Sequence, residues 1–195
     1  MSKNIVPLQD VGMRVSKWNA ARYAREHNLD LAVRLLEEEL GEFFTSNEEV
    51  DRLDGLCDTI YVAFGVIWKC NGQGETIEPY FDRAFQFVDE LPNDMLVYAA
   101  YAKACITSMQ FGASPIQMSA NIILLCLAEA MDSLHMTYDE VVQALHVVCD
   151  SNDSKKIKRV ASDVKANDND KGDTFIPPEK SLQLILDNRV TKRFH

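Results

Sequence analysis

Glycine and proline are scarce in this sequence, with eight and six residues in a chain of 195. A disordered or low-complexity chain would be rich in these residues, so their scarcity argues against one. Hydrophobic residues make up 47% of the chain, which is enough for a sizeable core. The sequence also contains no internal repeat and no convincing strand pattern. We therefore predict an all-α protein that forms a single domain over residues 1–195.

Paired cysteines are also lacking. The five cysteines form no Cys-x-x-Cys pair and are scattered through apolar stretches: Cys57, Cys70, Cys105, Cys126 and Cys149. An odd number at such spacings indicates free thiols in a reducing compartment. The first ten residues have no apolar signal core, and the longest apolar stretch, Ile122 to Ala128, is too short to span a bilayer. We expect a soluble, cytoplasmic protein with no membrane partner.

Basic residues are outnumbered, with 20 Lys and Arg against 30 Asp and Glu and a net charge of −10. No basic stripe offers phosphate contacts over a long surface, so we expect no nucleic-acid partner. A nucleotide substrate is still compatible with this charge, because a bound divalent cation reverses the local field.

Several catalytic patterns are missing as well. The four histidines stand in no arrangement with serine or cysteine, and there is no Gly-x-x-x-x-Gly-Lys phosphate loop. A di-iron carboxylate protein would need two Glu-x-x-His pairs on facing helices. The nearest match is Asp132-x-x-His135, and His146 has Gln143 three residues before it. This alternative is disfavoured, and the iron content of the purified protein would test it.

Acidic residues are concentrated between Leu35 and Gly65. This stretch predicts two helices joined by a short polar turn at Thr45-Ser46-Asn47 and packed antiparallel, with axes about 8–10 Å apart. Residues three or four apart project from one helix face, so carboxylates from both helices can meet at one point. The residues concerned are Glu38, Glu39, Glu42, Asp54 and Asp58.

Apolar residues surround these five carboxylates, and the second helix is nearly all apolar after Asp58. We therefore predict a central, buried helix and acids that point inward. Clustered carboxylates repel each other and lose solvation unless a cation or protons compensate. Oxygen-only ligands of this kind suit Mg²⁺ or Mn²⁺, so we interpret the five residues as a metal site. Glu37 and Glu49 are predicted to be solvated.

The remaining chain is predicted to be helical with one polar segment. A first helix is expected from about Asp10 to His27, where Trp18 is interpreted as core packing, with a base pocket as the alternative. Further helices fill an inserted segment over about 67–127, and another opens at Thr137. A polar tail follows over about 150–195: a loop from Asp150 to Thr174, then an apolar anchor and a short terminal helix.

Three separated segments resemble the all-α nucleoside triphosphate pyrophosphohydrolases, in particular the MazG-like and phosphoribosyl-ATP-pyrophosphohydrolase-like proteins of bacteriophages. The segments are EELGEF at 38–43, DGLCDTIYVAFG at 54–65, and SNDSK at 151–155 with the later Lys171-Gly172 and FIPP. The resemblance covers roughly residues 10–66 and 128–187. It implies hydrolysis of a (deoxy)nucleoside triphosphate to the monophosphate and pyrophosphate, in the host cytoplasm if a phage encodes the protein.

The resemblance also implies roles for individual residues. Mg²⁺, with Mn²⁺ as a possible substitute, would be bound by the five carboxylates, and Glu38 or Glu39 would act as the base. Asn152, Lys155 and Lys171 would hold phosphate oxygens. Trp18 is placed near the substrate by its own alternative interpretation as a wall of a base pocket, and not by the resemblance. Relatives of this kind are oligomers, so we expect a homodimer or homotetramer.

Two departures from the family pattern keep a second interpretation open. Many relatives carry Glu-x-x-Asp on the second helix, whereas Gly55 stands three residues before Asp58 here. We expect Asp54 to substitute, with Asp51 as the alternative. The segment over 67–127 is absent from compact relatives and could cover the nucleotide or build a subunit interface. The second interpretation is a catalytically silent helical interaction protein with the same fold, in which Asn152 and Ser154 only cap helices and Lys155 is solvated.

Overall fold

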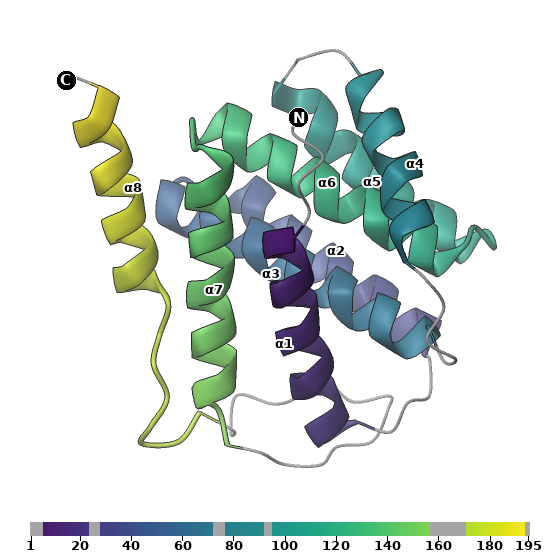
Figure 1. The fold of residues 1–195 in the computed structure, drawn as a ribbon, viewed down its shortest axis with the longest axis horizontal. Helices are drawn as coiled ribbons and strands as arrows, with labels where there is room; N and C mark the ends of the chain where they lie inside the picture. The colour runs from purple at the N-terminus through teal and green to yellow at the C-terminus, as the bar shows by residue number, and fades with distance from the viewer. Residues whose placement is uncertain (1–5, 24–27, 72–76, 92–94, 157–170, 194–195) are drawn as a thin grey trace.

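The computed structural model describes residues 6–23, 28–71, 77–91, 95–156 and 171–193 of the chain. Within these ranges the protein is all-α, as predicted, and contains no strand. The helices are α1 (Val6–Arg22), α2 (Leu29–Thr45), α3 (Glu49–Cys70), α4 (Glu78–Asp89), α5 (Met95–Gln110), α6 (Pro115–Ser133), α7 (Tyr138–Ser154) and α8 (Glu179–Arg193). Helices α3 and α6 pack against each other and together contact all six others (Figure 1).

Helices α2 and α3 form the expected pair, joined by residues 46–48. The side chain of Asn28 caps α2 by accepting a hydrogen bond from the backbone N–H of Leu31 at 2.9 Å. Gly55 lets the two helices approach closely, because a Cβ at this position would lie only 2.9 Å from the backbone nitrogen of Phe43. The part of α3 beyond Asp58 is mostly buried, which confirms the predicted central helix.

The segment over 67–127 contains α4, α5 and most of α6. Helices α4 and α5 both pack on α6, and α5 also contacts α2. Gly112 adopts a φ of 89° after α5, a conformation that glycine accepts without steric cost. Ser114 then caps α6, whose residues are buried over most of its length.

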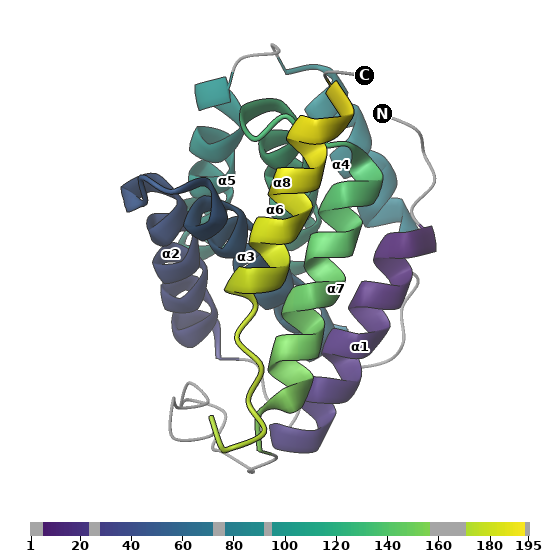
Figure 2. The ribbon, with the colours of Figure 1, turned by 90° about the vertical axis from the view of Figure 1, so that its left-hand side faces the viewer.

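Helices α1 and α7 lie side by side, and both differ from their predicted bounds (Figures 1 and 2). Helix α1 ends at Arg22 rather than near His27, and residues 24–27 lie outside the described part of the chain. Helix α7 continues to Ser154, so the predicted loop over 150–174 was wrong for residues 150–154, while residues 155–156 and 171–174 lie outside helices as predicted. The guanidinium of Arg14 on α1 pairs with Asp150 at 2.7 Å and Asp153 at 2.6 Å, which helps hold this polar end helical.

Helix α8 packs on α3 and α7 near the C-terminus (Figure 2). Its buried Arg189 donates hydrogen bonds to the backbone oxygen of Leu134 and, at 2.9 Å, to the Glu49 carboxylate. Glu49 is therefore ion-paired as well as exposed, whereas Glu37 is simply exposed, as predicted. Much of the predicted loop, residues 157–170, lies outside the described residues. Within the described part of the chain, no helix is both long and apolar enough to cross a membrane.

Candidate functional site

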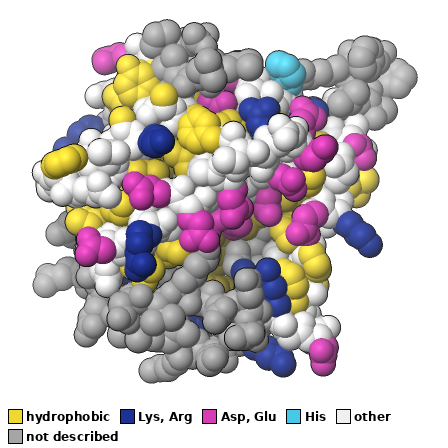
Figure 3. Space-filling view, turned by 180° about the vertical axis from the view of Figure 1, so that it is seen from behind, with side chains coloured by type: hydrophobic (Ala, Val, Ile, Leu, Met, Phe, Trp, Pro, Cys, Tyr) yellow, Lys and Arg dark blue, Asp and Glu magenta, His cyan; other side chains and the backbone are white. Residues whose placement is uncertain are grey.

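One cavity of about 420 Å³ brings together the predicted site residues. Its walls come from α1, α2 and α3, from the end of α7 and from Lys171. The predicted residues that line it are Trp18, Glu38, Glu39, Glu42, Asp54, Asp58, Asn152, Lys155 and Lys171. Seen from behind, the molecule carries a band of acidic side chains with lysine and arginine side chains beside it (Figure 3).

The five carboxylates share the cavity but differ in burial. Glu39 is only 8% exposed, and Asp54 and Asp58 are partly buried. Glu38 and Glu42 are exposed, so the expectation that all five point inward was wrong for these two. Glu38 and Glu39 are adjacent and therefore point in different directions around α2, whereas Glu38 and Glu42, four residues apart, share the side that reaches solvent.

Gly55 explains the departure from the family pattern on α3. A Cβ at this position would also lie 3.1 Å from the backbone oxygen of Glu39, so an acidic side chain there would force α2 and α3 apart. Asp54, one residue earlier, lines the cavity instead. The alternative ligand, Asp51, is exposed and is not among the cavity residues.

Burial and mutual repulsion disturb the two aspartates. Burial, followed by the negative charges of Glu179, Glu39 and Glu42, raises the pKa of Asp54 to about 7. The pKa of Asp58 is raised well above its ordinary value, first by burial and then by the charge of Asp54, while Lys155 opposes the shift. Oδ1 of Asp54 is buried without a hydrogen-bond partner among the described residues. The two aspartates therefore hold protons more readily than ordinary carboxyl groups, and a bound cation would relieve the same repulsion.

The donor set fits a hard divalent cation, although the side chains are not arranged around one point. Across the described ranges, no three acidic, cysteine or histidine side chains form a ready group of metal ligands. A cation would relieve two features: the Asp54 oxygen that has no hydrogen-bond partner within the described ranges, and the repulsion between carboxylates. Binding would require the longer glutamate side chains to move toward the aspartates.

Two lysines face the carboxylates from the end of α7 and from the chain before α8. Lys155 follows α7 directly, and its Nζ donates a hydrogen bond to Oδ1 of Asn152 at 2.8 Å. Lys171 lies 5.2 Å from the ring centroid of Phe175, and Lys155 lies 6.0 Å from the same ring. The side chain of Ser154 accepts a hydrogen bond from the backbone N–H of Ile176 at 2.9 Å. This bond holds the stretch before α8 against the end of α7.

The other end of the cavity is aromatic and largely apolar. Trp18 packs edge-on against Tyr61, with ring centroids 5.8 Å apart, and its Nε1 donates a hydrogen bond to the backbone oxygen of Asn152 at 2.9 Å. Trp18 is thus both a packing residue and a cavity wall. The hydroxyl of Tyr61 is buried without a hydrogen-bond partner among the described residues.

Sequence reasoning missed several residues at this end, including Tyr23, Tyr61, Gly65 and Lys69. Helical spacing was the available signal, because positions 58, 61, 65 and 69 of α3 follow one another at intervals of three or four. Trp18 on α1 was predicted near the substrate, but Tyr23 had no comparable signal in the sequence.

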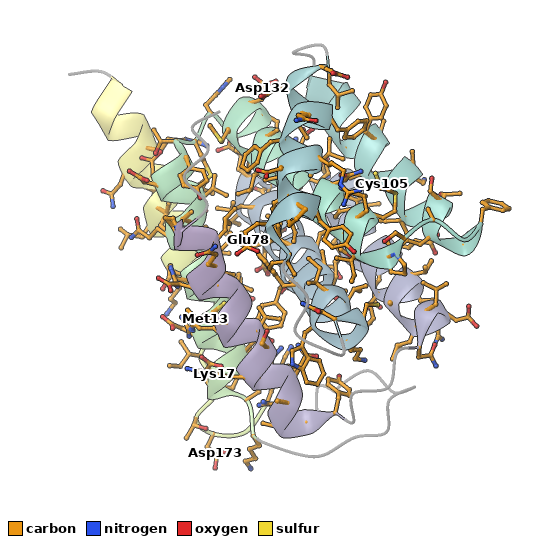
Figure 4. All side chains as sticks on the ribbon, turned by 45° about the vertical axis from the view of Figure 1, so that its right-hand side comes forward. Met13, Lys17, Glu78, Cys105, Asp132 and Asp173 are labelled. Carbon is orange, nitrogen blue, oxygen red and sulfur yellow. The ribbon has the colours of Figure 1, made fainter. Side chains whose placement is uncertain are left out.

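A second cavity of about 640 Å³ lies between α1, α3 and α4. Its floor includes the buried side chains of Phe64 and Phe81, and Figure 4 labels Met13, Lys17 and Glu78 along it. It is larger than the first cavity, but its few charged groups lie on exposed residues. The first cavity is therefore the better candidate for a functional site.

Comparison with known protein families, with curated proteins and with solved structures found no match. The resemblance of the motifs therefore stays a prediction, and the functional argument rests on the geometry of the cavity.

Proposed function

We propose that the protein is a Mg²⁺-dependent nucleoside triphosphate pyrophosphohydrolase that controls a nucleotide pool. The observation that carries this proposal is a single cavity in which five carboxylates face two lysines and an asparagine, with aromatic walls beyond them. This distribution of charge suits a ligand that has phosphates at one end and a planar base at the other. The fit of the oxygen donors supports Mg²⁺, with Mn²⁺ as a substitute.

The proposed reaction is attack of water on the α-phosphorus. The water oxygen bonds to phosphorus, the bridge to the β-phosphate breaks, and pyrophosphate leaves. A divalent ion bound by the carboxylates would neutralise phosphate charge and lower the pKa of the attacking water. Glu38 or Glu39 would accept the proton of that water. Lys155 and Lys171 would bind phosphate oxygens as point charges, assisted by the amide of Asn152.

A catalytically silent helical interaction protein is the second candidate. It is favoured by the absence, among the described residues, of three side chains already arranged as metal ligands. It predicts a folded protein that Mg²⁺ does not stabilise and that turns over no nucleotide. For either candidate we expect a homodimer or homotetramer, which light scattering would measure.

The test is to incubate the protein with Mg²⁺ and each of the eight common NTPs and dNTPs, and to separate the products by anion exchange. We expect monophosphate and pyrophosphate from one or more substrates. Asp58→Asn and Glu42→Gln should lower turnover by about a hundredfold or more, because each removes a proposed metal ligand. Glu37→Gln is the matched control, since Glu37 is exposed on the same helix outside the cavity.

Two results would contradict the proposal. Diphosphate and phosphate as products would show that a different bond is cut. No turnover by a protein that is folded by circular dichroism, together with no thermal shift on adding Mg²⁺, would favour the silent interaction protein.

A further inference from the structure

We infer that Lys69 and Asn19 recognise the base of the substrate, and that the preferred base presents a carbonyl oxygen to Lys69, as guanine, thymine and uracil do. This inference rests on the proposed function, since it assigns the end of the same cavity that the reaction does not use.

Helix α3 runs along the cavity, so the spacing of its residues gives the length of the cavity. Asp58 lies at the carboxylate end and Lys69 at the other, which at 1.5 Å per residue places them about 16 Å apart along the helix. Helix α2 runs antiparallel beside it, so its cavity residues change from glutamates to Leu35 and then Leu31 in the same direction. An extended nucleoside triphosphate with its phosphates at the carboxylates would therefore place its base near Lys69.

The walls at this end suit a planar ring. The ring centroids of Trp18 and Tyr23 lie 6.1 Å apart, and both residues line the cavity. Aromatic rings of this kind bind flat, partly polar ligands through their faces and edges. Gly65 also lines the cavity, and a Cβ there would lie 3.4 Å from Nδ2 of Asn19, so the absence of a side chain leaves this amide uncovered on that side. The hydroxyl of Tyr61, which also lines the cavity and has no hydrogen-bond partner in the described part of the chain, likewise favours a polar ligand.

Among the described residues, Lys69 is the charged residue that lines this end of the cavity, and the guanidinium of Arg22 lies 4.1 Å from the ring centroid of Trp18. The Nζ of Lys69 lies 4.5 Å from the ring centroid of Tyr23, and the lysine is partly buried. Burial lowers the pKa of Lys69 from its ordinary value of 10.5. Within the described residues no ion pair involves Lys69, so its ammonium group can donate hydrogen bonds to a ligand in the cavity.

The hydrogen-bonding capacity of the Lys69 ammonium group determines which bases it can bind. A lysine side chain only donates hydrogen bonds. Guanine and thymine present a carbonyl oxygen at the edge where adenine and cytosine present an amino group, and an amino group cannot accept from lysine. Asn19 is buried, and its Nδ2 already donates to the backbone oxygen of Val15 at 2.9 Å. Its amide oxygen therefore has a fixed direction and can accept from a ring N–H of the same keto bases.

The experiment compares kcat/KM for dGTP, dTTP, dATP and dCTP in the wild type, Lys69→Met and Lys69→Glu. The wild type should favour the keto bases by at least about tenfold, the smaller end of what one hydrogen bond to a charged group contributes. Lys69→Met should reduce this ratio by about tenfold or more, mainly through KM. Lys69→Glu, which supplies an acceptor, should shift the preference toward dATP and dCTP. Lys17→Met is the control, because Lys17 is exposed on α1 outside this cavity.

A wild type that prefers amino bases, or an unchanged preference in Lys69→Met, would overturn the inference while leaving hydrolysis intact. Calorimetry with α,β-imido analogues of dTTP and dATP separates it from the proposed reaction. Keto-selective binding that is lost in Lys69→Met, in a protein without turnover, would support the base site and reject the hydrolysis. Binding of neither analogue would reject both.

Discussion

At the scale of one residue, the environment of the Asp54 carboxyl group in the cavity makes the stability of the fold depend on pH. One of the carboxyl oxygens is buried and unpartnered among the described residues, and the pKa of Asp54 is raised from 3.8 to about 7, first by burial and then by neighbouring carboxylates. The folded protein therefore binds a proton here more tightly than the unfolded chain does. The stabilisation that results is fully present below pH 3.8 and is lost as the pH rises through about 7.

Asp54→Asn should remove this dependence. In EDTA, the free energy of unfolding of the wild type should fall as the pH rises from 4 to 7, and that of the variant should fall less. At pH 8 the variant should be more stable by about 1–2 kcal/mol, less than the full pKa shift would give because water in the cavity screens the charge. Urea denaturation at several pH values measures both effects.

The same stability measurement is then repeated with Mg²⁺ added. If the carboxylates bind the ion, 10 mM Mg²⁺ should stabilise the wild type at pH 8, because a ligand that binds only the folded state raises the free energy of unfolding. The asparagine variant should gain less from the ion. Parallel pH profiles for the two proteins, or an equal gain from Mg²⁺, would contradict the account of Asp54.

At the scale of helices, the contact between α2 and α3 sets the distance between the glutamates on α2 and the aspartates on α3. Gly55→Ala should reduce the free energy of unfolding by about 1–3 kcal/mol, because the added Cβ meets the backbone of Phe43 and Glu39 rather than a side chain that can move. Turnover should fall as well, since the carboxylates on the two helices move apart.

Gly41→Ala is the matched control for this change. Position 41 is also a glycine within a helix of the pair, but a Cβ there meets nothing within 4 Å. Alanine at this position should stabilise the protein by about 0.5–1 kcal/mol through helix propensity alone. Urea denaturation of both variants decides the matter, and equal effects at the two positions would mean that the helices do not meet at Gly55.

The same helices show how far the sequence alone could lead. The period of the acids and apolar residues predicted α2, α3 and the gathering of their carboxylates, because these features depend on spacing within a short stretch. The end of α7 was predicted as a loop because its composition is polar. Its helical form is supported by Arg14, which lies far away in the sequence and pairs with Asp150 and Asp153.

Trp18 was placed near the substrate from the sequence, but the position of Lys69 in the same cavity could not be predicted, for a similar reason. Lys69 is an ordinary lysine in the last turn of α3. Only the fold places it beside Tyr23, which follows α1. The pairing of α1 with α3 depends on tertiary packing and leaves no local pattern. Asn152 and Lys155, in contrast, were found through the resemblance of the motifs, although their place beside the carboxylates needed the fold.

At the scale of the whole molecule, the cavity is assembled from segments near both ends of the chain. Helix α1 supplies Trp18, and the stretch between α7 and α8 supplies Lys171. Helix α8 follows this stretch, and the charge of its first residue, Glu179, contributes to the raised pKa of Asp54. The attachment of α8 to the rest of the fold therefore bears on the geometry of the site.

Arg189 is the side chain through which that attachment can be tested. Only 7% of it is exposed, and it bridges the backbone oxygen of Leu134 at the end of α6 and the carboxylate of Glu49 at the start of α3. Arg189→Met should reduce the free energy of unfolding by about 2–4 kcal/mol, because it leaves a buried carbonyl without its donor and removes the ion pair. Since Lys171 precedes α8, KM for the triphosphate should also rise.

Glu49→Gln separates the ion pair from the buried hydrogen bond. The Glu49 side chain is 51% exposed, so its charge contributes little, and this variant should cost less than about 1 kcal/mol while KM stays close to that of the wild type. Urea denaturation and steady-state kinetics on both variants provide the comparison. If Arg189→Met were no worse than Glu49→Gln, the bond to Leu134 would contribute nothing, and α8 would be held by its apolar residues alone.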